Sequence, residues 1–267
     1  MEGFLKRNPA VKTLKSKKID YKRVKSVTIE AIQEFFRILT IPEVKQIPKN
    51  LRWNMDETGI AEGVQKDNLV LGCSGKPSIF VQSSEGRTWT SIVECISAEG
   101  RYLSPLVIFK GKTSFDATVN GWTSNDIGLQ WLEKVFIPGT AADALAQGSK
   151  RLLIIDGHGS HVSDEFMWKC YCEGIYLACL PAHSSHVTQP LDLSVFSPLK
   201  ASYRKHLRIH NYIFNSAPIS KQNFLRCYSH AWKEAFTSQT IINDHTRDKV
   251  IDVLPWHTPL PVTPRKP

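Results

Sequence analysis

The chain has 267 residues, 42% of them hydrophobic, and 12 Phe and 7 Trp are among them. This composition supports one sizeable core and argues against a disordered chain. No stretch approaches the roughly 18 apolar residues of a membrane-spanning helix, and the N-terminus lacks the apolar run of a secretory signal. We therefore expect a globular intracellular protein without a membrane partner.

Positive charge is unevenly distributed along the chain. The formal net charge is +9, from 34 Lys and Arg against 25 Asp and Glu. Nine basic residues lie between Lys6 and Lys25, and a second basic stretch contains Lys200, Arg204 and Lys205. Clustered cations attract a polyanion because binding releases its counterions, so we expect DNA as the partner, bound by this second stretch. The alternative is a solvated basic surface.

Apolar periodicity predicts the elements of the first half of the chain. Helical spacing in VTIEAIQEFFRIL predicts a helix over 27–39, and the prolines and Asn50 that follow indicate a linker. Strand patterns come next, separated by Gly, Ser and charged turns, at 51–56, 68–73, 87–98 and 104–110.

Helices and strands alternate in the second half. An apolar strand is predicted at 152–155 and another, of the fully buried kind, at 175–181. Helices are predicted at 126–136, between Ser163 as N-cap and Gly174 as stop, and in most of the region after Pro190. Antiparallel-looking strands followed by helix–strand–helix–strand–helix predict an α/β fold. It consists of a mixed sheet flanked by helices, in the order of the ribonuclease-H-like fold.

Acidic residues occur at three strand or helix boundaries. Asp56 ends the strand at 51–56, Asp156 ends the apolar strand, and Asp192 lies where a loop passes into a helix. The 35 residues between Asp156 and Asp192 allow the chain to return to the same edge of the sheet. Three carboxylates at one place repel each other unless a cation lies between them, and their hard oxygens suit Mg²⁺ or Mn²⁺. On spacing alone, Asp156 fits a helix-capping role equally well.

Several long motifs, found in order along the chain, carry a family resemblance. They are NMDETGI at 54–60, WTSIVECISAEGRYLSPLVIFKGK at 89–112, NGWTSNDIGLQWLEKVFIP at 120–138, LLIIDGHGSHVSDEF at 152–166 and LPAHSSHVTQPLDLSVFSPLK at 180–200. With these motifs the chain resembles the DDE-type endonuclease domain of pogo-like transposases. The likeness is greatest to the fungal Fot1-like branch of the Tc1/mariner superfamily.

This resemblance implies a ribonuclease-H-like fold, two bound Mg²⁺ (or Mn²⁺) ions, and DNA strand cleavage and transfer. It also implies a nuclear location and assembly as a homodimer. The catalytic and metal-binding acids would be Asp56, Asp156 and Asp192, and the Gly-rich turn after Asp156 would allow ions and DNA to approach. The histidines expected to orient these acids or to contact phosphate are His158, His161 and His186.

The resemblance also divides the chain into three parts. Residues 1–49 are expected to be a basic segment and helix left from the link to a lost helix-turn-helix domain. Residues 50–236 form the endonuclease domain, and 237–267 an irregular Pro-rich tail. Relatives carry a longer segment between FKGK and NGWTSN and a glycine-containing stretch near the end. The chain is therefore interpreted as N-terminally truncated and internally shortened, which leaves open whether it is an active enzyme.

Two other functions remain open at this point. A domesticated, centromere-protein-B-like remnant would bind DNA without cutting it. A zinc hydrolase would use two H-x-x-H pairs, His158 with His161 and His183 with His186, although both pairs lie in predicted loops and not on one helix with a Glu base. The six cysteines have no C-x-x-C spacing, which favours buried free thiols over a structural zinc site.

Overall fold

The computed structural model describes residues 28–62, 89–109, 124–157, 163–214 and 219–242. Within these segments, five strands form one mixed sheet in the order β3-β2-β1-β4-β5. The strand β1 is antiparallel to β2 and parallel to β4, while β2 and β3 are antiparallel and β4 and β5 parallel. The strands are β1 (Arg52–Ala61), β2 (Trp89–Ser97), β3 (Leu106–Ile108), β4 (Arg151–Ile155) and β5 (Ile175–Cys179).

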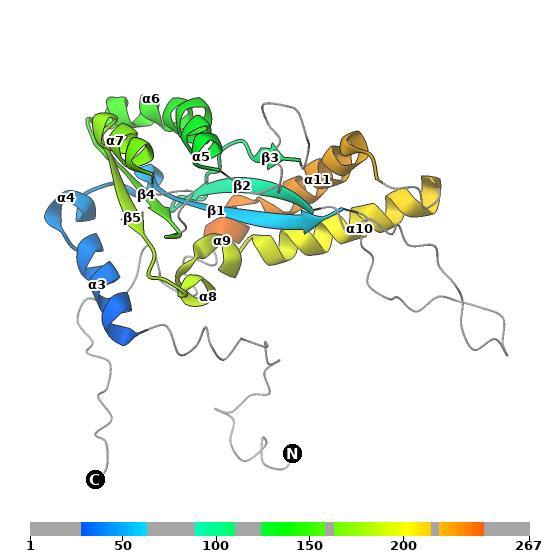
Figure 1. The fold of residues 1–267 in the computed structure, drawn as a ribbon, viewed down its shortest axis with the longest axis horizontal. Coiled ribbons are helices and arrows are strands. Elements are labelled where there is room, and N and C mark those ends of the chain that lie inside the picture. The colour runs from blue at the N-terminus through cyan, green and yellow to red at the C-terminus, as the bar shows by residue number, and fades with distance from the viewer. Residues whose placement is uncertain (1–27, 63–88, 110–123, 158–162, 215–218, 243–267) are drawn as a thin grey trace, which may run out of the picture.

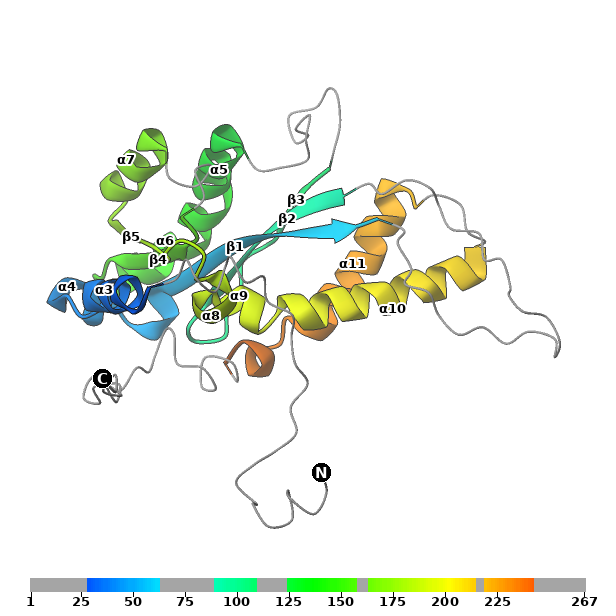
Figure 2. The same cartoon turned by 60° about the horizontal axis from the view of Figure 1, so that its bottom comes forward.

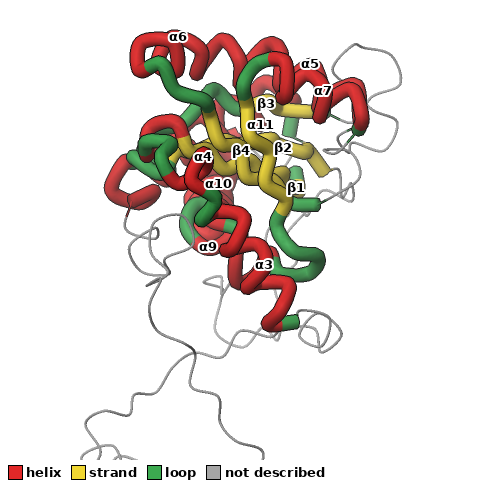
Figure 3. The backbone as a smooth tube through the Cα atoms, turned by 90° about the vertical axis from the view of Figure 1, so that its left-hand side faces the viewer, coloured by secondary structure: helices red, strands yellow, loops and turns green. Residues whose placement is uncertain are grey.

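Helices cover both faces of this sheet (Figure 1). Over one face lie α5 (Asn125–Trp131), the π-helical turn η2 (Leu132–Phe136), α6 (Ile137–Gln147) and α7 (Asp164–Cys172). On the other side lie α8 (Ser185–Thr188), α9 (Pro190–Leu193), α10 (Phe196–Phe214) and α11 (Lys221–Ala235), as Figure 2 shows from a second direction. This side also holds α3 (Ile29–Leu39) and α4 (Pro42–Lys45) (Figure 3), and the short 3₁₀ helix η1 (Lys49–Leu51) leads into β1.

The alternation of side chains along β1 separates two apolar cores. Trp53 and Met55 pack in the core beneath α5, η2 and α7, whereas Ile60 packs in the core beneath α10 and α11. By the same alternation, Asn54 and Asp56 face the second side. Two polar side chains therefore lie on the sheet face that α9 and α10 cover.

A third apolar cluster lies beside them on the same face. It joins Phe35 of α3 and Val44 of α4 to Leu152 and Ile154 of β4. The N-terminal helices thus pack directly on the sheet. The polar residues of β1 lie between this cluster and the core beneath α10 and α11.

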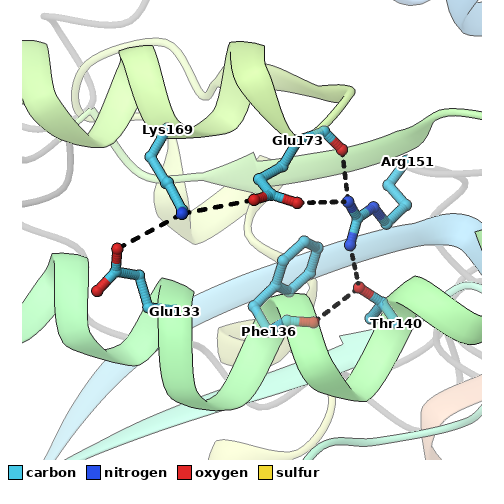
Figure 4. Close-up of polar contacts among 6 residues, drawn as sticks. All are labelled: Glu133, Phe136, Thr140, Arg151, Lys169 and Glu173. Atoms are coloured by element: carbon cyan, nitrogen blue, oxygen red, sulfur yellow. Dashed lines mark hydrogen bonds and ion pairs between the residues drawn. The ribbon is translucent and has the colours of Figure 1, made fainter.

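At the start of β4, polar contacts connect α6 and α7 to the sheet (Figure 4). The guanidinium of Arg151 donates to Thr140 Oγ1 at 3.0 Å and to the Glu173 carbonyl at 2.5 Å. Lys169 Nζ forms ion pairs with Glu173 Oε1 at 3.4 Å and with Glu133 Oε1 at 3.6 Å. Through Arg151, these contacts hold the start of β4 against α6 and the end of α7.

The predicted mixed sheet flanked by helices is confirmed, as are the strands at β2 and β4 and the helices at α3, α10 and α11. The boundaries of α7 are confirmed as well. Its N-cap Ser163 accepts a hydrogen bond from the Phe166 N–H at 3.3 Å, and Gly174 has a φ of 65° at its end. The apolar strand at 152–155 lies inside the sheet, between β1 and β5.

Three predicted features are wrong. The first strand does not end at Asp56: it runs to Ala61, because its second half pairs with β2 through Ala61↔Trp89. The strand at 175–181 is not fully buried, because β5 is an edge of the sheet and Cys179 is exposed. The linker predicted around Pro42 forms the short helices α4 and η1 instead.

The helix predicted at 126–136 is longer than expected, because η2 and α6 continue it to Gln147. Buried free thiols are found at Cys95, Cys170 and Cys227, whereas Cys172 and Cys179 are exposed and also free.

Some predicted features lie outside the described residues. They are the basic segment from Lys6 to Lys25, the strand at 68–73, most of the segment between FKGK and NGWTSN, and the Pro-rich end. Among the helices that are described, none is both long enough and apolar enough to cross a membrane.

Candidate active site

Asp56 lies in the middle of β1 with its side chain 6% exposed. The parallel pairing of β1 with β4 runs through Asn54↔Ile154, so the same register continued by two residues sets Asp56 level with Asp156. Asp156 is the residue directly after β4, so it lies at the end of that strand, beside the interior of the longer β1. The parallel register therefore brings these two acids together where β4 ends.

Asp192 approaches the same place from a helix on one face of the sheet. It belongs to α9, which packs on β1 and β2 on the side that Asp56 faces. The three acids differ in exposure: Asp56 is buried, Asp156 half-buried and Asp192 exposed. They form a gradient from the protein interior to solvent.

Electrostatics shows that the three carboxylates lie within reach of one another. The pKa of Asp56 is raised well above its usual value, first by burial, then by repulsion from Asp192 and from Asp156. Hydrogen bonds from the Glu57 N–H, at 2.8 Å, and from Gln189 oppose this shift without cancelling it. A nearby cation would remove the repulsion and favour the charged carboxylate.

The donor set fits a hard divalent cation in its chemistry. Three carboxylates supply oxygen ligands of the kind that Mg²⁺ and Mn²⁺ prefer, and their mutual repulsion is the charge that such an ion would neutralise. Within the described segments, however, no three His, Cys, Asp or Glu side chains are already arranged so that they could hold an ion.

The predicted DNA-binding residues Lys200, Arg204 and Lys205 lie along α10. Burial lowers the pKa of half-buried Lys200, while the charges of Asp192 and Asp56 act in the opposite direction. Arg204 follows one turn later and is exposed. Lys205 instead pairs with Glu234 of α11, with Nζ 3.2 Å from Oε1. Lys200 is therefore the basic residue that the structure brings to the acids.

The predicted histidines are not placed by the structure. His158 and His161 lie outside the described residues, and the backbone of His186 belongs to α8 without a described side chain. Their proposed roles stay predictions.

A further residue of the site, Asn54, is not among the residues predicted from the sequence. It is a fully buried amide two residues before Asp56. The sequence could have indicated it, since a polar residue that faces inward from a buried strand needs hydrogen-bond partners.

The chain matches one family across more than half of its length. Residues 86–245 match the family described as DDE superfamily endonuclease. The chain belongs to this family. Asp156 and Asp192 fall inside the matched range, and Asp56 precedes it. The predicted membership in the DDE endonucleases is confirmed.

Two of three similar proteins carry the names of pogo transposable elements. The chain is 28% identical over 145 residues to the human "Pogo transposable element with ZNF domain", covering 50% of this chain and 10% of the relative. It is 26% identical over 161 residues to the human "Pogo transposable element with KRAB domain", covering 57% and 26%. A protein of Cochliobolus lunatus named "MFS-type transporter clz9" is 36% identical over 208 residues, covering 71% and 22%. This chain therefore spans only about a tenth to a quarter of these relatives.

Solved structures identify the fold of this DDE endonuclease domain. The Mos1 strand transfer complex superimposes with a TM-score of 0.55 at 11% identity, covering 94% of this chain and 65% of that one. The Mos1 transposase catalytic domain, solved with Raltegravir and Mn, gives 0.52 at 10% identity, covering 88% and 92%. The ribonuclease-H-like fold predicted from the sequence is thereby confirmed.

Proposed function

We propose that this DDE endonuclease domain cleaves and transfers DNA strands by divalent-metal chemistry at Asp56, Asp156 and Asp192. The observation that carries the proposal is that three separate segments bring their acids to one place: the β1–β4 register sets Asp56 level with Asp156, and α9, which holds Asp192, packs on β1 and β2. Repulsion from Asp192 and Asp156 contributes to the raised pKa of buried Asp56. Three carboxylates from three separate segments converge there at a cost in repulsion, which a fold would retain where a cation is bound.

Each acid has a distinct position in this scheme. Asp56, held by β1 and buried, would be the least mobile ligand, while half-buried Asp156 and exposed Asp192 face the side from which a substrate arrives. Two divalent ions, when bound, activate a water or 3′-hydroxyl and stabilise the leaving oxygen of a phosphodiester. The Mos1 structures solved with Mn and with Mg support a divalent cation for this chain too.

DNA would bind along α10. Lys200 lies within electrostatic reach of the acids, and Arg204 is exposed on the following turn. Basic side chains at this spacing would bind phosphates with release of counterions and direct the DNA backbone to the three acids. The Mos1 strand transfer complex supports DNA as the partner, and we propose that the domain acts on DNA as a homodimer.

Nicking of supercoiled plasmid in Mg²⁺ and in Mn²⁺, with and without EDTA, tests the proposal. The wild type should nick only with metal, and Asp156→Asn should abolish nicking while keeping its circular dichroism spectrum. Asp126→Asn, on the exposed first turn of α5, is the matched control and should nick like the wild type.

Other outcomes separate the alternative functions. A folded wild type that binds plasmid but leaves it intact in either metal would contradict cleavage and favour a non-catalytic DNA-binding role. Tightly bound zinc in the purified protein, together with hydrolysis that Asp156→Asn does not affect, would favour a zinc hydrolase.

A further inference from the structure

We infer that Asn54 and Gln189 act as a pair of positioning residues that hold the three acid-bearing segments in register. This inference rests on the proposed function for its purpose, but its structural content stands on the contacts of the two amides. Both side chains are fully buried, with 0% exposure. They meet on the face of the central strand β1 that α9 covers, where Asn54 Nδ2 donates to Gln189 Oε1 at 2.7 Å.

Asn54 contacts all three segments that carry an acid. It belongs to β1, two residues before Asp56. Its Nδ2 also donates to the Ile154 carbonyl of β4 at 3.1 Å, two residues before Asp156. Its Oδ1 accepts from the Leu191 N–H at 3.3 Å, one residue before Asp192. A single amide therefore links β1, β4 and α9 immediately beside each carboxylate.

The Leu191 contact also explains how so short a helix is held. The first four N–H groups of a helix have no partner within it, and Leu191 is the second residue of α9. Asn54 supplies the missing acceptor from the sheet. The orientation of α9, and with it the direction of Asp192, is thus set by a side chain of β1.

Gln189 completes the pair from the other side. Its Nε2 lies 3.5 Å from the Met55 carbonyl, and its side chain also hydrogen-bonds the Asp56 carboxylate. Gln189 directly precedes α9, so it connects the entry of that helix to the buried acid itself. Hydrogen bonds of this kind fix the direction of a metal-binding carboxylate.

The amide chemistry is specific at both positions. Asn54 must donate to two carbonyl oxygens and accept from one backbone N–H. A carboxylate at this site has no donor for the Ile154 carbonyl, and an aliphatic side chain leaves every partner unsatisfied in a buried place. Only an amide serves all three contacts.

The test combines variants that remove the polar atoms at nearly constant size. They are Asn54→Leu, Gln189→Met and the double variant, with Thr140→Val as the matched control. Thr140 is also buried, at 1% exposure, and hydrogen-bonded through its side chain, but it lies far from the acids at the opposite end of β4. Circular dichroism and thermal unfolding establish whether each variant folds. If Asn54→Leu does not fold, Gln189→Met still tests the inference.

The first readout is Mn²⁺ affinity, measured by the electron paramagnetic resonance signal of free Mn²⁺ without DNA. Asn54→Leu and Gln189→Met should each weaken binding roughly 10- to 100-fold, the range found for residues that orient metal ligands. The double variant should weaken it by less than the product of the two, because both act through one unit. Thr140→Val should bind Mn²⁺ like the wild type.

The second readout is independent of metal. Amide hydrogen exchange at Leu191, measured by NMR in EDTA, should accelerate at least tenfold in Asn54→Leu relative to amides of β2, and remain unchanged in Thr140→Val. Unchanged exchange at Leu191, or Mn²⁺ affinity equal to wild type in folded Asn54→Leu and Gln189→Met, would overturn the inference. A wild type that binds no Mn²⁺ would instead contradict the proposed function, while the exchange result would still decide whether the pair holds α9.

Discussion

Buried Glu94 makes the stability of this fold depend on pH in a direction opposite to that of most carboxylates. It lies on β2, paired across the sheet with Asp56, and has 0% exposure. Burial raises its pKa from 4.5 to about 8, although hydrogen bonds donated by the Tyr228 hydroxyl and by Trp232 Nε1 favour the charged form. Burial therefore outweighs both hydrogen bonds.

The sign of the effect follows from proton binding. Between pH 4.5 and about 8 the folded chain holds the Glu94 proton that the unfolded chain has lost. The stability that protonated Glu94 contributes is thus fully present below pH 4.5 and is lost as the pH rises through about 8. The loss has a limiting slope of about 1.4 kcal/mol per pH unit, and the size of the shift caps the total at roughly 5 kcal/mol.

The assay is urea unfolding of the wild type and Glu94→Gln in EDTA at several pH values between 5 and 9. The difference in unfolding free energy should shift in favour of the variant as the pH rises, while the contribution of Asp56 cancels between the two proteins. Glu99→Gln, at an exposed turn position, should follow the wild type. A difference between Glu94→Gln and wild type that stays constant with pH would refute the reasoning, because Glu94 would then be ionised in the fold.

Three further predictions concern other sites. Asp56→Asn should lose less unfolding free energy than the wild type in EDTA as the pH rises, because burial and repulsion raise the pKa of Asp56 and so destabilise its charged form. It should also abolish nicking; urea unfolding and plasmid nicking check this. Arg151→Met should cost about 3 kcal/mol by urea unfolding, since it breaks buried hydrogen bonds and an ion pair, against less than about 1 kcal/mol for Arg37→Met at an exposed pair. Gly100→Ala should lower the melting temperature more than Gly148→Ala. Both glycines have positive φ, but a Cβ at Gly100 would lie 2.9 Å from the Ile242 side chain, whereas a Cβ at Gly148 would have no neighbour within 4 Å. Equal losses in melting temperature would contradict this.

Local patterns in the sequence predicted the elements whose residues decide their own structure. The strand before Asp156 is apolar on both faces, and β4 lies inside the sheet with every residue buried. The start of α7 is set by Ser163, whose side chain caps the helix as its sequence position indicates. These features depend on a few neighbouring residues, so they can be predicted without the rest of the fold.

Features set by distant partners could not be predicted in this way. The length of β1 beyond Asp56 comes from its pairing with β2, and the exposure of β5 comes from its place at the edge. The continuation of α5 to Gln147 is not evident from local pattern, because Pro138 lacks the N–H donor of a regular helix and lies in the first turn of α6, directly after the π-helical turn η2. The contacts of Asn54 join residues 100 to 137 positions apart in the sequence, so only the tertiary structure reveals them.

The most direct test of the account is whether the three acids act as one site. Plasmid nicking in Mn²⁺ should be measured for Asp56→Asn, Asp156→Asn, Asp192→Asn and the pair Asp156→Asn with Asp192→Asn, each shown to be folded. If the carboxylates bind metal together, each single variant should lose nearly all activity, and the double variant should be no worse than either single one. Nicking that survives in any single variant, or losses that multiply in the double variant, would contradict a shared three-carboxylate centre.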